Sequence, residues 1–161
     1  MTAVRYERAE LGATYLPVGK MLQLDRVLEV LGDRIVAAMD IKPEHWVFAE
    51  HFPGDPIFPG SFLIEAAGQL VALWGWEVGL RGRPRMAKAS AQFENPVLAE
   101  DGTVTLRAQV RRRRNMCFGA VEVQSGERKV ATVEVVIVVV NGTDPVTPDR
   151  GGFAGAPPPE R

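Results

Sequence analysis

One stretch of this chain, residues 61–79, is long enough and apolar enough to predict a sizeable buried helix. Pro59 and Gly60 precede the stretch, as helix breakers often do. Ser61 can serve near the N-terminal cap, and Gly79 suits the C-terminal end. The apolar side chains cover every face, and a helix that is apolar all round is a buried one. In a chain of 161 residues it must be wrapped by a sheet, or by a sheet together with a partner subunit.

The segments around this helix have the alternation and turn chemistry of antiparallel strands. Arg26–Leu31 and Arg34–Ile41 are apolar-rich runs joined by Gly32 and Asp33, a pair that closes hairpins. Further strands are predicted after the helix, over residues 85–93, 103–111, 116–124 and 129–140. The last of these loses its alternation, which predicts a central strand covered on both faces. The sequence therefore predicts an α+β domain in which a curved antiparallel sheet wraps one long central helix.

Length and composition limit the domain organisation and the partners. A chain of this length predicts one domain, over residues 1–141, and the Pro/Gly-rich residues 142–161 predict a disordered tail. Lys and Arg total 19 against 20 Asp and Glu, so the basic excess of a nucleic-acid-binding protein is missing. No segment predicts a secretory signal or a membrane span, so we expect a cytoplasmic protein without nucleic-acid or membrane partners.

Several conspicuous residues are interpreted as structural. The single cysteine, Cys117, excludes an intramolecular disulfide and is expected to be a buried, inert thiol. With only two histidines beside it, a structural zinc site is not expected. Trp74 and Trp76 could line a tunnel, although core packing is favoured. The arginines at 111–114 could attract an acidic carrier protein, but a solvated strand end is favoured.

The predicted helix carries one isolated carboxyl group. Glu65 is the only ionisable side chain between Ser61 and Trp76, and Gln69 lies one turn further along the same face. Apolar surroundings raise the pKa of a carboxyl, which makes Glu65 a candidate proton donor near neutral pH. The alternative is a carboxylate that reaches solvent or pairs with an arginine.

The loop before the helix carries a candidate base. His51 opens the run HFPGDPIFPG, whose prolines and glycines fix the path of the loop into Gly60. A lone histidine more often packs or makes a structural hydrogen bond. Here, however, the loop ends at a helix N-terminus, where the N–H of Gly60 and the helix dipole can polarise a carbonyl oxygen. Base, acid and oxyanion donor can thus be supplied within 15 residues.

Residues 51–69, HFPGDPIFPGSFLIEAAGQ, strongly resemble the active-site segment of the hotdog-fold 3-hydroxyacyl-[acyl-carrier-protein] dehydratases. The upstream run GKMLQLDRV, residues 19–27, resembles the leading segment of that family, and the resemblance covers roughly residues 16–140. It implies the hotdog fold. It also implies that His51 is the base, that Glu65, 14 positions later, is the acid, and that Gly60 opens the helix.

The activity implied by the resemblance is the removal of water from a 3-hydroxyacyl thioester to give the trans-2-enoyl thioester. The Gly60 N–H would hold the thioester carbonyl while His51 takes the α-proton and Glu65 protonates the departing hydroxyl. Gln69 would orient the carboxyl, and the Ile57 carbonyl would bind the other imidazole nitrogen.

The resemblance also implies the setting of this reaction. No cofactor is implied, because an acyl carrier protein of fatty-acid or polyketide synthesis presents the substrate on its phosphopantetheine arm. A homodimer is implied, with active sites at the interface, because in this family the histidine and the carboxylate of one site come from different subunits. Phe58 and Phe62 stand where the family often has smaller or more flexible residues, and would reshape the acyl tunnel.

Two sequence features bear on which branch of this family the chain resembles. Glu65 matches the branch that only dehydrates, whereas the branch that also isomerises the double bond has Asp there. Residues 54–56 and the Met21-Leu22 pair are more similar to the isomerising branch. The alternatives to a dehydratase are an acyl thioesterase on the same fold and a non-catalytic partner subunit of a dehydratase heterodimer.

Overall fold

The computed structural model describes residues 4–140, so the expected tail over residues 142–161 lies outside the described part of the chain. Among these residues, seven strands form one sheet in the order β1-β2-β3-β5-β6-β7-β4, and every neighbouring pair is antiparallel. The elements are, in chain order, β1 (Tyr6–Glu7), the 3-10 helices η1 (Arg8–Ala13) and η2 (Gly19–Met21), β2 (Arg26–Leu31), β3 (Arg34–Ile41), α1 (Val47–Glu50), α2 (Gly60–Glu77), β4 (Arg83–Phe93), β5 (Gly102–Arg113), β6 (Met116–Ser125) and β7 (Arg128–Val140).

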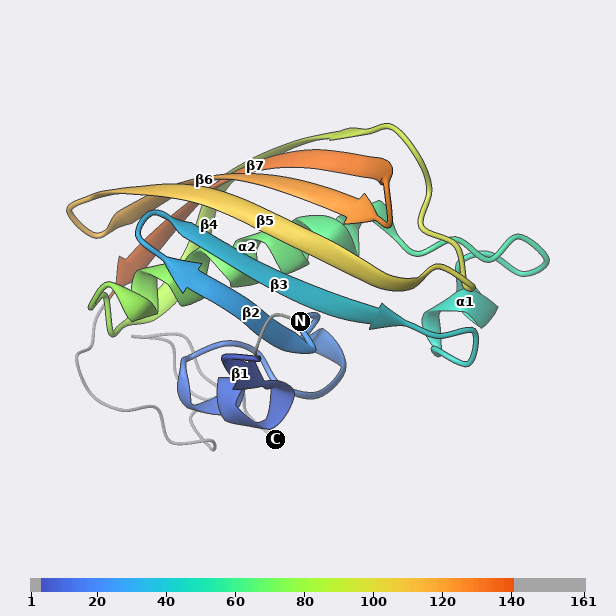
Figure 1. Cartoon of the computed structure of the whole chain (residues 1–161), viewed down its shortest axis with the longest axis horizontal. Helices are drawn as coiled ribbons and strands as arrows, with labels where there is room; N and C mark the ends of the chain where they lie inside the picture. Colours follow the sequence, from blue (N-terminus) through green and yellow to red (C-terminus); the bar gives the residue numbers. More distant parts are fainter. Residues whose placement is uncertain (1–3, 141–161) are drawn as a thin grey trace, which may run out of the picture.

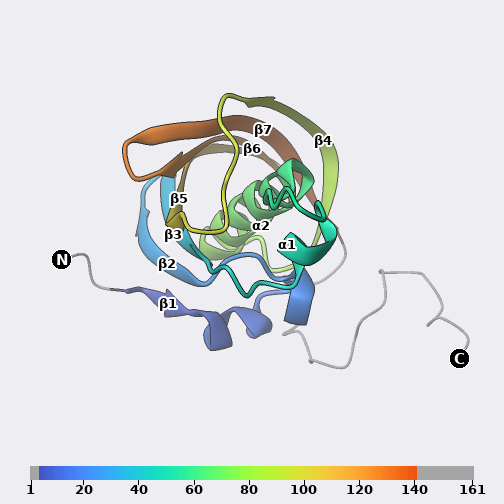
Figure 2. The ribbon, with the colours of Figure 1, turned by 90° about the vertical axis from the view of Figure 1, so that its right-hand side faces the viewer.

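The sheet curls around α2, which is the α+β hotdog arrangement expected from the sequence (Figures 1 and 2). Strands β3 to β7 all contact the helix, and its apolar side chains and theirs form one core. At Gly119 of β6, an added Cβ would lie 2.2 Å from Cγ2 of Val71. Glycine therefore lets the centre of the sheet approach the helix closely.

Most of the expected elements are confirmed. The first hairpin has the expected bounds, and Gly32 in its turn has a φ of +58°. The long helix begins one residue earlier than expected, at Gly60, because Pro59 and not Ser61 occupies the N-cap position. No side chain caps that end. The short helix α1 was not predicted from the sequence.

The expectation that the last strand is covered on both faces is wrong. β7 does lie inside the sheet, between β6 and β4. Val135 and Ile137 are buried, but Val136 and Val138, which point to the other face, are only half-buried. The helix covers one face of a single sheet, so the outer face of β7 stays apolar without being fully enclosed.

Candidate active site

His51 lies directly after α1 and ends that helix. Its Nδ1 is 2.8 Å from the carbonyl oxygen of Ile57, which is the contact that the resemblance implied. A carbonyl oxygen can only accept a hydrogen bond, so in the neutral imidazole Nδ1 carries the ring proton and Nε2 keeps its lone pair. The N–H of Ile57 in turn donates to the carbonyl of His51 at 2.9 Å and closes the loop. The imidazole is thus held in the tautomer in which Nε2 can accept a proton.

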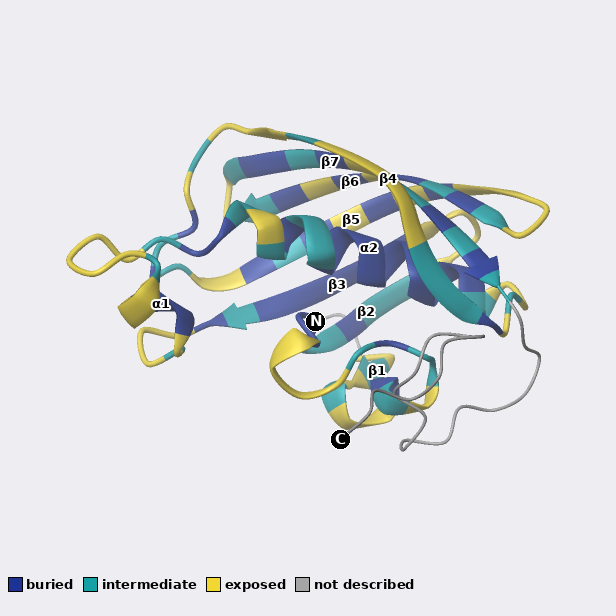
Figure 3. Cartoon of the chain, turned by 180° about the vertical axis from the view of Figure 1, so that it is seen from behind, coloured by how far each residue is buried: buried dark blue, intermediate teal, exposed yellow. Residues whose placement is uncertain are grey.

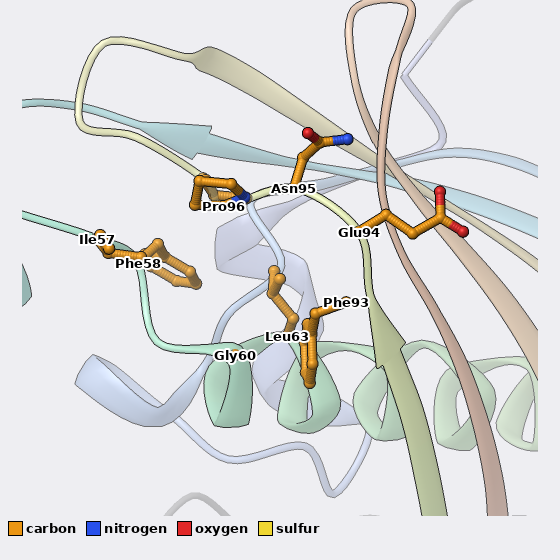
Figure 4. A pocket seen from close by; sticks show the side chains of 9 residues that line it. Ile57, Phe58, Gly60, Leu63, Phe93, Glu94, Asn95 and Pro96 are labelled. Carbon is orange, nitrogen blue, oxygen red and sulfur yellow. The ribbon is translucent and has the colours of Figure 1, made fainter.

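Gly60 is the first residue of α2, and a phenyl ring lies directly over it. An added Cβ at Gly60 would lie 2.9 Å from two ring atoms of Phe93, the last residue of β4 (Figure 4). The first N–H groups of a helix have no partner within the helix, and this terminus has no side-chain cap. The helix dipole adds partial positive charge there. A substrate oxygen can therefore bind at this amide, and glycine leaves room for Phe93 beside it.

Glu65 lies half-buried on the second turn of α2. Burial raises the pKa of its carboxyl, and a hydrogen bond from Gln69 acts in the opposite direction. That bond runs from Nε2 of Gln69 to Oε2 of Glu65 over 3.3 Å. Since burial is the larger effect, the carboxyl is biased toward its protonated form, as expected from the apolar helix sequence.

A cavity of about 360 Å³ lies between the start of α2 and the segment that follows β4 (Figure 4). Of the predicted site residues, Ile57, Phe58 and Gly60 line it, together with Leu63 and Phe93. A second cavity, of about 380 Å³, also has the buried side chain of Phe58 in its lining.

The structure brings only part of the predicted site together within one chain. His51, Glu65, Gln69 and Phe62 do not line the cavity at Gly60. The ring of Phe62 instead packs against Phe58 at a centroid distance of 5.7 Å, beside the partly exposed face of α2.

Two residues of the site were missed by sequence reasoning. Phe93, over Gly60, lies 33 positions along the chain and is brought there by the path of β4. Gln23 belongs to the segment that resembles the family, yet nothing in its own sequence pattern indicated its contact. Its backbone N–H donates to Oε1 of Gln69 at 2.9 Å. Both contacts depend on tertiary packing, which carries no local sequence signal.

Of the residues interpreted as structural, Trp74 and Cys117 lie in the core, whereas Trp76 does not. Trp74 is buried and its Nε1 donates to the carbonyl of Gly32 at 3.0 Å. Trp76 is half-buried and its ring packs against Tyr15 and Arg81, so the expected core packing is wrong for this residue. Cys117 is fully buried, and burial raises the pKa of its thiol.

Between residues 4 and 140, no three His, Cys, Asp or Glu side chains gather closely enough to hold a metal ion. No helix in the same part of the chain has the length and apolarity to cross a membrane.

The curved sheet around one central helix defines a hotdog-fold protein. A sequence model of the FabA-like domain family matches residues 16–134, and the chain belongs to that family.

Solved structures share this fold at low sequence identity. The dehydratase heterocomplex ApeI:P from Xenorhabdus doucetiae superposes with a TM-score of 0.67 at 18% identity, covering 86% of this chain and 95% of that one. A hypothetical thioesterase with coenzyme A from Streptococcus pneumoniae superposes with a TM-score of 0.56 at 14% identity, covering 71% of this chain and 84% of that one. The E. coli PaaI protein from the phenylacetic acid degradation operon superposes with a TM-score of 0.54 at 18% identity, covering 70% of this chain and 80% of that one. These likenesses show the fold alone.

Proposed function

We propose that this chain dehydrates a 3-hydroxyacyl thioester, carried by an acyl carrier protein, to the trans-2-enoyl thioester. The observation that carries the proposal is the contrast between the surroundings of two side chains. The Ile57 carbonyl orients the imidazole of His51 through Nδ1, which leaves Nε2 free to face a substrate, and burial raises the pKa of the Glu65 carboxyl. An oriented imidazole and a carboxyl with a raised pKa suit the base and the acid that an elimination of water requires.

In the proposed reaction, each residue acts on a different group of the substrate. The N–H of Gly60 donates to the thioester oxygen and stabilises the negative charge that develops there. Nε2 of His51 takes the proton from the α-carbon, and the electron pair forms the double bond between the α- and β-carbons. The bond from the β-carbon to oxygen breaks as Glu65 gives its proton to the departing hydroxyl, which leaves as water. The imidazolium and the carboxylate then exchange protons with solvent for the next turnover.

A second copy of the chain is part of the proposal, so that Glu65 of one copy faces His51 of the other. Within residues 4–140, β4 is the last strand of the sheet and has β7 on one side. Met86 and Phe93 on this strand are exposed, and the partly exposed first turns of α2 lie beside it (Figure 3). A long edge strand with exposed apolar side chains is typical of an interface. These observations support a homodimer that covers β4 and the start of α2.

An acidic carrier protein is the proposed donor of the substrate, and the arginines at 111–114 are its proposed docking surface. All four are exposed, and Arg112 donates to the carbonyl of Val78 at 3.3 Å, beyond the C-terminal end of α2. Gly60 is at the opposite end of the same helix. A two-fold dimer joined by antiparallel β4 edges reverses the second helix, which would bring one copy's arginines toward the other copy's site.

A thioesterase on this fold is the second candidate, because the solved structures of similar fold include thioesterases. Such an enzyme needs an ionised carboxylate to activate water. The burial that raises the pKa of Glu65 opposes this role and favours the dehydratase.

Incubation of the purified chain alone with a set of 3-hydroxyacyl carrier proteins, followed by mass spectrometry of the carriers, tests the proposal. The proposed function predicts loss of one water with the thioester intact. Release of the free acid would indicate a thioesterase. Turnover that appears only when a second, different subunit is added would indicate a non-catalytic partner. Either of the last two results would overturn the proposal.

A further inference from the structure

Gln23 and Gln69 are the two polar side chains that are buried among the described residues, with 6% and 3% of their surface exposed. Burial of an amide is unfavourable unless its polar atoms are hydrogen-bonded. These two lie in contact: the backbone N–H of Gln23 donates to Oε1 of Gln69. Although 46 residues separate them in sequence, the turn at residues 19–23 and the middle of α2 meet here.

The surroundings of Gln69 permit only one orientation of its amide. Oε1 faces an N–H, which can only donate, and Nε2 donates to the carbonyl of Met21 at 2.7 Å. A flipped amide would set Nε2 against the N–H of Gln23 and Oε1 against the carbonyl of Met21. Both of those contacts would be repulsive, so the amide cannot turn over.

This orientation determines how Gln69 meets the acid. One hydrogen of Nε2 goes to Met21 and the other to Oε2 of Glu65. Oε2 therefore accepts a hydrogen bond, and a proton on the neutral acid is directed to Oε1. A general acid delivers its proton best when the proton is on one defined oxygen.

The side chain of Gln23 holds the turn that fixes Gln69. Its Nε2 donates to the carbonyls of Lys20 and Met21, at 3.2 Å and 3.1 Å. Met21 thus accepts hydrogen bonds from both glutamines, through the same carbonyl. Residues 19–21 form the 3-10 helix η2, which is too short to hold this geometry by itself.

We propose that Gln23 is a positioning residue for the acid: through the turn at residues 19–23 and the amide of Gln69, it keeps the proton of Glu65 on Oε1. The proposal rests on the proposed dehydratase function. It goes further by adding a residue that does not reach the substrate and by assigning the proton to one oxygen.

The kinetic test uses Gln23→Met and Gln69→Met, which keep side-chain volume and remove the amide, and the double variant. We expect kcat to fall on the order of 10-fold in Gln69→Met and about threefold in Gln23→Met, both smaller than the ~10²–10⁴-fold of a whole general acid, with KM nearly unchanged. The double variant should match Gln69→Met, because Gln23 acts through Gln69. Additive losses, or no loss, would overturn the proposal. Gln109→Met, at an exposed site on β5, is the matched control and should leave kcat unchanged.

A second readout does not need activity. A ¹³C NMR titration of the carboxyl of Glu65, assigned with Glu65→Gln, reports its pKa directly. Burial raises this pKa, and the Gln69 hydrogen bond lowers it. Removal of the donor should move the titration to higher pH in Gln69→Met, and in the same direction but less in Gln23→Met. An unmoved titration in both variants would overturn the proposal. A moved titration in a chain without dehydratase activity would refute only the proposed function.

Discussion

Two parts of α2 have similar apolar composition but different surroundings: residues 60–65, which we call its open half, and residues 66–75, which we call its covered half. Residues 66–75 are all buried, because the strands of the same chain enclose them. Among residues 60–65, only Leu63 is buried, Ser61 is exposed, and the other four are half-buried. Figure 3 shows this first part of the helix with no strand in front of it.

The difference separates the residues that build the core from those to which we assign the proposed chemistry. The covered half contributes apolar side chains to the core, whereas Gly60 and Glu65 belong to the half that one chain leaves partly open. Gln69 is the exception: it is buried, and it reaches back one turn to Glu65. The sheet of one chain therefore encloses only the later part of the helix, and we infer that a second surface completes the site.

Substitutions in the two halves should have opposite consequences, and these are the largest effects we expect. Glu65→Gln, and His51→Ala in the adjoining loop, should each lower kcat for dehydration by about 10²–10⁴-fold. Leu70→Ala in the covered half should lower the free energy of unfolding by about 2–5 kcal/mol, while the folded variant keeps its kcat. Enzyme kinetics and urea unfolding of all three variants measure both quantities. Dehydration at the wild-type rate by Glu65→Gln or His51→Ala would contradict the role of that residue.

Gly60→Ala tests the start of the open half. The new methyl group would lie 2.9 Å from the ring of Phe93, so the helix start or the ring must move. We expect kcat to fall on the order of 10- to 100-fold, because the Gly60 N–H no longer points at the thioester oxygen. Phe93→Ala added to Gly60→Ala should restore most of the loss. If the double variant stays as slow as the single one, the clash with Phe93 is not the cause.

Phe58 lies just before the open half, and its side chain lines both cavities, so we expect it to separate them. In Phe58→Leu the shorter side chain should join them, so that longer acyl chains are accepted. We expect the ratio of kcat/KM for long over short acyl chains to rise about 10-fold. Phe62→Leu is the control, since Phe62 lines neither cavity. The same change in both variants would argue against the separating role of Phe58.

The smallest expected effect is on stability, through the half-buried carboxyl of Glu65. Burial raises its pKa in the folded chain above the ordinary value of 4.5. Below that pH, both the folded and the unfolded chain hold the proton, and the group has no effect on stability. Above it, the carboxyl ionises less readily in the folded chain than in the unfolded one, so stability relative to Glu65→Gln is lost as pH rises through the folded pKa. In thermal unfolding, the Tm of Glu65→Gln should be higher than that of the wild type at about pH 8 but not at about pH 4. A gain of equal size at both pH values would contradict this account.

Local chemistry explains what the sequence could predict. Gly32 and Asp33 specify a hairpin turn, the continuous apolar run specifies a buried helix, and the Pro/Gly loop leads from His51 to Gly60. The contacts of Phe93 and Gln23 could not be predicted, because they join segments that only the folded sheet and helix bring together. The four-residue helix α1 was missed because it is too short for a periodic pattern.

The central claim, that each site combines Glu65 of one chain with His51 of another, can be tested by mixing two inactive variants. His51→Ala and Glu65→Gln are unfolded together, refolded, and assayed for dehydration. Each mixed dimer has one site with both groups intact, so random pairing should restore about a quarter of the wild-type activity. If the mixture stays as inactive as either variant alone, although mass spectrometry detects the mixed dimer, the shared site is contradicted.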